Sequence, residues 1–170
     1  TSAKVVKTGI DTANYLESEY STEKTRAYLR AAAQARAKKI NEGTFAQINK
    51  ELNRDFEEDE EPDIEHVYEV RSNTSDVLAR SAAGAIASFA VQEAAHQAIS
   101  EGAPRVIGKI VEKEWVTGAN ARPSHQAMNG ERVPIDADFS NGQHWPGEDI
   151  GDPEESCGCN CTTEVVITGG

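Results

Sequence analysis

The chain has 170 residues, of which 17 are basic and 29 are acidic, so its formal net charge at pH 7 is −12. Nucleic acids and anionic membranes bind cationic surfaces, so this charge argues against sequence-specific nucleic-acid binding and favours a basic or neutral protein partner. No apolar run approaches the length of a membrane-spanning helix, and the length suits one domain, or a small domain with a helical arm.

Residues 1–20 contain few apolar side chains. Five of these side chains could dock on a neighbouring surface, namely Val5, Val6, Ile10, Tyr15 and Leu16. The alternative is an arm that is mobile or that a partner orders, because chain termini are often poorly fixed.

Residues 21–52 are predicted to form two helices. Ser21 or Thr22 can cap a first helix that runs to Ile40, and Gly43 ends it. Residues 44–47, Thr-Phe-Ala-Gln, form a capping box for a short second helix. Both helices are mostly polar, so they need a partner surface, which is either the rest of the chain or another subunit. We therefore predict a helical arm over residues 1–54.

Residues 55–63 hold seven carboxylates in nine positions. Such a block repels itself and prefers solvent, and it lacks the alternating ligands and the central glycine of a calcium loop. We therefore predict an acidic linker over residues 55–72, within which residues 64–70 fit either a short strand or the start of a helix.

A long helix is predicted after this linker. The Asn-Thr-Ser-Asp run at residues 73–76 is typical of a helix start, and the helix should cover residues 76–100 until Gly102 and Pro104 stop it. Its predicted buried stripe consists of Leu78, Ala82, Ala85, Ile86, Phe89, Ala90 and Glu93.

The rest of the chain has the pattern of short strands separated by turns. Residues 105–117 are rich in β-branched side chains, Asn129-Gly130 predicts a hairpin between two extended runs, and residues 162–168 predict a closing strand. Long helices followed by short strands predict an α+β fold. In this fold, residues 73–170 form one domain, whose small, loop-rich antiparallel β lobe is closed by a cysteine-rich segment.

The three cysteines, Cys157, Cys159 and Cys161, alternate along the chain. Alternate side chains of an extended segment point to one face, so the three thiols can share a zinc ion, and His125 and His144 are the imidazoles available in the same half. A structural zinc ion would stabilise a lobe that has few aromatic residues. Buried thiols without a metal, and a disulfide-bonded or oxidation-sensitive set, are the alternatives.

An enzymatic interpretation uses Arg122, His125 and His144 as acid, base and phosphate clamp of a metal-free nuclease, or pairs one thiol with a histidine. The sequence has no phosphate-binding glycine loop, no nucleophile elbow and no metalloprotease helix motif. We therefore predict no catalytic residues, and a hydrolase or nuclease-type effector remains the alternative.

Several short motifs follow one another in a fixed order between residues 113 and 166. They are Lys113, Trp115 and Thr117, then Arg122-x-x-His125, Asn129-Gly130, Val133-Pro134, Phe139, Pro146-Gly147 and Cys159-x-Cys161-Thr162. This order resembles the C-terminal module of the Mu F-like minor head proteins of tailed bacteriophages. The chain departs from that pattern in three places: Gly158 stands where the family usually has Asn, Cys157 is an extra thiol, and Asn120 stands where an acidic residue is common.

The resemblance implies a minor virion protein at the portal vertex or in the head interior, present in the host cytoplasm during assembly. Its partners would be the portal protein and capsid subunits, with homo-oligomer formation left open, and it would aid head assembly and DNA packaging or ejection. By resemblance, Trp115, Arg122, His125, Gly130, Cys159 and Cys161 form the signature cluster, for which we expect a fold-holding role. A free-standing zinc-binding interaction module outside any virion is a further alternative.

Overall fold

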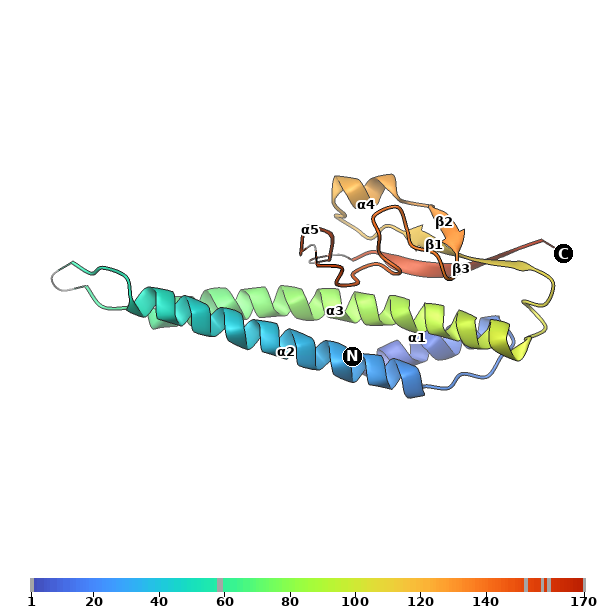
Figure 1. Cartoon of the computed structure of the whole chain (residues 1–170), viewed down its shortest axis with the longest axis horizontal. Helices are drawn as coiled ribbons and strands as arrows, with labels where there is room; N and C mark the ends of the chain where they lie inside the picture. Colours follow the sequence, from blue (N-terminus) through green and yellow to red (C-terminus); the bar gives the residue numbers. More distant parts are fainter. Residues whose placement is uncertain (1, 58–59, 152, 157, 159, 170) are drawn as a thin grey trace.

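A computed structural model describes residues 2–57, 60–151, 153–156, 158 and 160–169. Helices α1 (Ser2–Tyr15), α2 (Glu23–Leu52) and α3 (Ile64–Glu101) form one layer, and a small sheet lies on the C-terminal half of α3 (Figure 1). The C-terminal half of α2 and the N-terminal half of α3 extend beyond the sheet as a pair of antiparallel helices. The prediction of an α+β fold with long helices and a small antiparallel sheet is confirmed, whereas Cys157 and Cys159 of the predicted cysteine-rich closure lie outside the described residues.

Helix α2 is continuous across Gly43, so the predicted break between two helices is wrong. A Cβ atom on Gly43 would lie 2.5 Å from Nη2 of Arg71, so the glycine leaves room for a side chain of α3. Arg71 donates to the Ile40 carbonyl oxygen at 3.2 Å and to Thr44 Oγ1 at 3.3 Å. The sequence feature that resembles a helix end is therefore a close contact between two helices.

Helix α3 begins twelve residues before the predicted start, inside the segment that we assigned to a linker. The Asp63 side chain caps it by accepting from His66 N at 2.9 Å. The hydroxyls of Thr74 and Ser75, which resemble a cap, instead donate to carbonyl oxygens one turn back. The predicted end is correct, because Gly102 adopts a left-handed conformation with φ 65° and closes the last turn.

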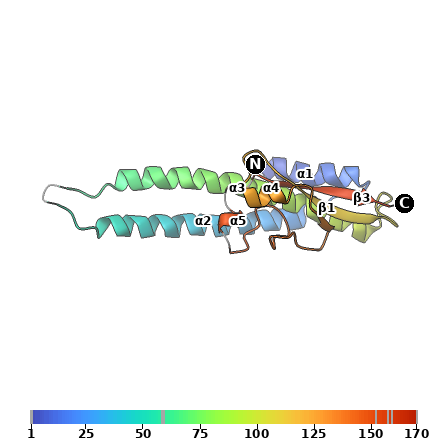
Figure 2. The same ribbon diagram turned by 90° about the horizontal axis from the view of Figure 1, so that it is seen from above.

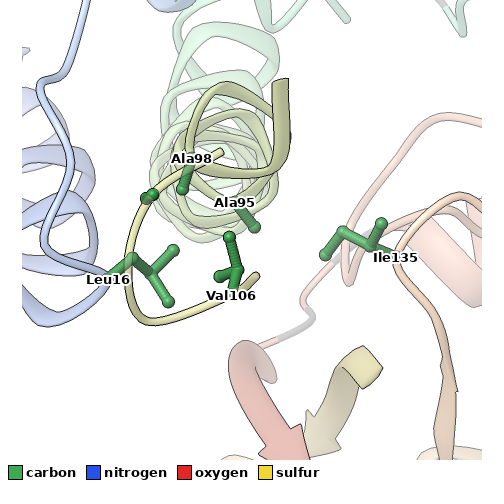
Figure 3. Packing of buried hydrophobic residues seen from close by; sticks show 6 residues of the cluster. Leu16, Ala95, Ala98, Val106 and Ile135 are labelled. Atoms are coloured by element: carbon green, nitrogen blue, oxygen red, sulfur yellow. The ribbon is translucent and has the colours of Figure 1, made fainter. Parts of the chain in front are cut away.

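Helix α1 packs along α3 and does not form a mobile arm in this structure. Leu16, directly after α1, is fully buried against Ala95, Ala98 and Val106 (Figure 3). Val5 is also buried, whereas Ile10 and Tyr15 are largely exposed. Two of the five predicted docking residues thus form the interface, because only one stripe of a helix can face its neighbour.

The sheet has the order β2-β1-β3, and both pairs are antiparallel. Strand β1 (Ile110–Val116) lies between β2 (Arg132–Pro134) and β3 (Thr162–Thr168). The bounds of β3 are those predicted from the sequence. The connection from β1 to β2 contains the short helix α4 (Pro123–Ala127), so Asn129-Gly130 is not a two-residue hairpin turn. These two residues instead bind the end of β1, because Gly130 N donates to the Trp115 carbonyl oxygen at 2.8 Å and Asn129 Oδ1 accepts from Thr117 N at 3.0 Å.

An aromatic cluster fixes the lobe to the helices. Trp145, in the loop before the short helix α5 (Pro153–Ser156), contacts the rings of Tyr28 on α2 and Phe89 on α3 edge-on, at centroid distances of 5.5 and 5.2 Å. The Tyr28 and Phe89 rings stack at 4.1 Å.

In the part of the chain that the structure describes, no helix has both the length and the apolar character needed to cross a bilayer.

The docking of α1 predicts a contrast between two substitutions. Leu16→Ala should lower the free energy of unfolding by about 2–5 kcal/mol, because it leaves a cavity between α1 and α3. Ile10→Ala, at a side chain that is 39% exposed, should change it by less than about 0.5 kcal/mol. Urea unfolding monitored by circular dichroism measures both values, and equal losses would contradict a docked α1.

Candidate functional site

Several of the motif residues gather in one buried cluster, to which β1, α4 and the segment before β3 contribute. Trp115 projects from β1, and its ring meets those of His125 and Phe139 edge-on, each at a centroid distance of 5.1 Å. Cys161, one residue before β3, and Met128 complete the cluster. Trp115, His125 and Cys161 are each at most 1% exposed, so this cluster is sealed from solvent.

Local backbone geometry explains how His125 and Cys161 meet. Arg122 is extended, as a residue before proline should be, and Pro123 then starts α4, which carries His125 inward. On the other side, Gly118 touches the backbone of Asn160, whose carbonyl oxygen would lie 2.1 Å from a Cβ on that glycine. This close approach places Cys161 beside the imidazole.

His125 lies between a carboxylate and a thiol. Its Nε2 is 2.8 Å from Glu155 Oε2, and its Nδ1 is 3.7 Å from Cys161 Sγ. Partial burial of Glu155 acts to raise its pKa, but hydrogen bonds from Asn141, His125 and Ser124 outweigh it and hold that pKa below its usual value. An ionised carboxylate can only accept, so Nε2 carries a proton and donates it to Glu155, and Nδ1 faces Cys161.

His144 lies in a different environment from His125. Its Nε2 is 3.0 Å from Asp138 Oδ1 and its Nδ1 is 3.2 Å from Glu148 Oε2, and the side chain is about half exposed. The structure therefore brings His125 and Cys161 together and pairs His144 with two carboxylates instead. Among the described residues no three side chains of His, Cys, Asp or Glu converge as metal ligands, and Cys157 and Cys159 are not among those residues.

The geometry of the described pair fits a tetrahedral zinc ion. Zinc binds imidazole nitrogen at about 2.0–2.1 Å and thiolate sulfur at about 2.3 Å, so two such ligand atoms lie about 3.6 Å apart. The separation of 3.7 Å between His125 Nδ1 and Cys161 Sγ is close to this value, and it is also that of a hydrogen bond between a thiol and an imidazole. The carboxylate of Glu155 on the opposite ring nitrogen is the arrangement that commonly orients a zinc-bound histidine.

The same three side chains also follow the order of a thiol nucleophile, its base and an orienting carboxylate. Cys161 and His125 are 1% and 0% exposed, however, and a nucleophile must reach its substrate.

Glu155, which was not predicted from the sequence, is the key addition to the site. The sequence offered little indication of its role, because Glu155 is one of 29 acidic residues and only the fold brings it to His125.

Lys113 is a second residue whose role was missed. It is completely buried on the inner face of β1, donates to Gln92 Oε1 at 3.3 Å and to the His144 carbonyl oxygen at 2.7 Å, and lies over the Phe139 ring. Burial lowers its pKa to about 8, against the opposing effect of Asp138, Glu148 and Asp136. A pattern signal existed, because residues 111, 113 and 115 alternate onto the buried face of the strand.

Comparisons of the chain with families of proteins, with curated proteins and with solved structures find no match. The site is therefore interpreted from its own geometry and from the motifs of this sequence.

Lys113 predicts a pH dependence of stability. Its pKa is about 8 in the folded chain and 10.5 in the unfolded chain, so between these values the unfolded chain binds more protons and stability rises with pH. The stability of the protein relative to its Lys113→Met variant should increase by about 2 kcal/mol from pH 8 to pH 10. Urea unfolding across this range tests it, and a difference that does not change with pH would contradict the depressed pKa.

Proposed function

We propose that the chain is a minor structural and assembly protein of a tailed-phage head, which associates with the portal or the inner capsid and aids DNA packaging or ejection. The order of its motifs resembles the Mu F-like minor head proteins. One observation supports applying that resemblance to this fold: Trp115, His125 and Cys161 pack together in one buried cluster, and Gly130 donates a hydrogen bond to the Trp115 carbonyl oxygen. Such a sealed cluster suits a fold-holding role.

The paired helices provide the surface for a partner. We define the distal hairpin as residues 40–52 of α2 and 64–77 of α3, which project past the lobe in both views (Figures 1 and 2). Large apolar side chains are exposed on it, namely Phe45, Leu52, Tyr68, Val70 and Val77. A groove of about 350 Å³ between the two helices is lined by Phe45, Ile48, Tyr68 and Arg71, among others. Exposed apolar side chains around a groove are typical of a protein-binding surface.

In this proposal the distal hairpin contacts the portal or capsid subunits, and the lobe provides a rigid base. The net charge of −12 is compatible with a location beside densely packed DNA, since an acidic protein is not trapped on phosphate. A gene for a portal protein beside the gene for this chain would support the assignment, and a genome without phage head genes would contradict it.

The distal hairpin predicts a binding defect with a matched control. Phe45→Ser combined with Tyr68→Ser should weaken binding to the portal protein of the same genome by at least about tenfold, because central aromatic residues dominate such interfaces. Ile110→Ser, which changes an equally exposed apolar residue on the lobe, should leave binding unchanged. Biolayer interferometry with purified portal measures both. Equal affinities for all proteins would exclude the hairpin as the contact, and no binding by the unmodified chain would contradict the assignment.

We also propose that a structural zinc ion closes the lobe. His125, through Nδ1, and Cys161 are two of its ligands, and Cys157 and Cys159, four and two residues before Cys161, are the candidates for the others. When bound, the ion would hold the segment before β3 against α4. His144 is not needed for this set, because its two ring nitrogens already face Asp138 and Glu148.

Zinc content tests this ligand set. Elemental analysis of protein purified under reducing conditions should find one zinc per chain, His125→Ala and Cys161→Ser should lose it, and His144→Ala should keep it. Glu155→Gln should weaken zinc affinity by about 10–100-fold, because it removes the carboxylate that orients the imidazole. Zinc-free native protein with an unchanged melting temperature in chelator would contradict the proposal, and loss of zinc in His144→Ala would contradict the ligand assignment.

A further inference from the structure

A groove of about 770 Å³ runs between α1, α3 and β3, apart from the zinc-site candidates and from the distal hairpin. Its walls are α1, from Lys4 to Tyr15, and the first four residues of β3, Thr162 to Val165, and its floor is α3, which contributes Ala87, Ser88 and Val91. Figure 2 shows α1 lying alongside β3. Ala87 and Ser88, two of the floor residues, have small side chains that leave space above α3.

The β3 side of this groove is a free sheet edge. In the order β2-β1-β3, no strand of the described residues pairs with the outer side of β3. Alternate residues of an edge strand present unpaired backbone N–H and C=O groups, and four residues of strand span about 13 Å. A row of alternating donors and acceptors of this length is matched by an extended polypeptide.

Two buried hydroxyl groups also lack a partner at this place. Ser88 Oγ on α3 and Thr163 Oγ1 on β3 have no hydrogen-bond partner in the part of the chain that the structure describes, although their residues are only 1% and 3% exposed. Buried hydroxyls are nearly always paired. Both residues line the groove, so a segment that entered it would pass beside these two hydroxyls.

Charge across the outer face of the sheet adds a third constraint. Arg132 on β2 pairs with Glu114 on β1, and Glu114 lies directly opposite Glu164 on β3. Glu164 is exposed and has no ion pair among the described residues. Glu164 thus faces a like charge on β1, and a basic side chain opposite it in a fourth strand would form a favourable cross-strand pair of opposite charge.

We propose that this groove binds an extended segment of a partner protein, which adds as a fourth strand to β3. Side chains of a strand alternate between faces, so the segment would carry a basic residue opposite Glu164 toward solvent. Its two neighbours would point inward, a small polar one toward Ser88 and Thr163 and an apolar one toward Val165. A second copy of this chain fits less well, because α1 flanks the β3 edge in each copy and would keep two such edges apart.

This binding does not depend on the assignment to a phage head. The probe is the synthetic peptide acetyl-Thr-Val-Lys-Thr-Val-amide, which in an antiparallel fourth strand places Lys opposite Glu164, Thr opposite Thr163 and Val opposite Val165. In matched peptides Glu replaces Lys, or proline replaces the Thr that follows Lys, whose N–H faces the β3 edge. Saturable shifts of the backbone amide signals of residues 162–165 are expected in nuclear magnetic resonance titrations. The Glu peptide should bind about fivefold more weakly because it places like charges opposite each other, and the proline peptide should not bind because it lacks a ladder N–H and fits only poorly into a sheet.

Three protein variants sharpen the experiment. Glu164→Lys should reverse the preference between the Lys and Glu peptides. Ser88→Ala combined with Thr163→Val should reduce binding of the Thr-containing peptide and not that of a peptide with Val at the inward positions. Ile107→Ser, at an exposed residue outside the groove and the distal hairpin, should bind as the unmodified chain does. Equal binding of the proline peptide, a preference that Glu164→Lys does not reverse, or no saturation by any peptide at millimolar concentration would overturn the proposal.

Discussion

The C-terminal half of α3 is the constraint on which the rest of the structure depends. Helices α1 and α2 pack on it within their layer, and the sheet covers it from above. Alanines at residues 85, 90, 94, 95 and 98 are all buried, so neighbouring elements approach the α3 backbone closely on several sides. Close packing of the neighbouring elements against the α3 backbone stabilises the core in place of large side chains. This explains how a chain with 6% aromatic residues forms a core.

The lobe depends on α3 in the same way. Gly147, in the Pro-Gly motif, adopts φ 78°, and a Cβ on it would lie 3.1 Å from Ala85 Cβ, so the loop sits directly on the helix. Trp145, two residues earlier, enters the aromatic cluster with Tyr28 and Phe89. Lys113 reaches Gln92 of α3 from the inner face of the sheet. Trp145 and Gly147 are thus explained as contacts to the helices, and Phe139 and Cys161 as members of the buried cluster around Trp115.

Patterns that depend on neighbouring residues were predictable, and patterns that depend on tertiary contacts were not. The closing strand, with its β-branched alternation, and the glycine that ends α3 were found at their positions because their signals are local. Gly43 gave a false helix end because its cause, Arg71, lies on another helix. At the site, Cys161, His125 and His144 were all candidates from the sequence, but the choice of His125 as the neighbour of Cys161 and the presence of Glu155 required the fold.

The cluster of motif residues is buried, whereas the surfaces proposed to bind partners are exposed elsewhere on the molecule, and this division fits the proposed role. The motif residues around His125 are buried, so selection for that pattern can act on shape without requiring contact with a partner. The exposed apolar residues lie instead on the distal hairpin, and the free strand edge lies beside α1. Because both surfaces rest on α3, the hairpin on residues 64–77 and the groove on residues 83–91, a partner held at the hairpin and a strand held at the groove would be fixed at a set distance. Such a spacer suits a protein that joins two components of an assembly, since each surface can bind without rearranging the core between them.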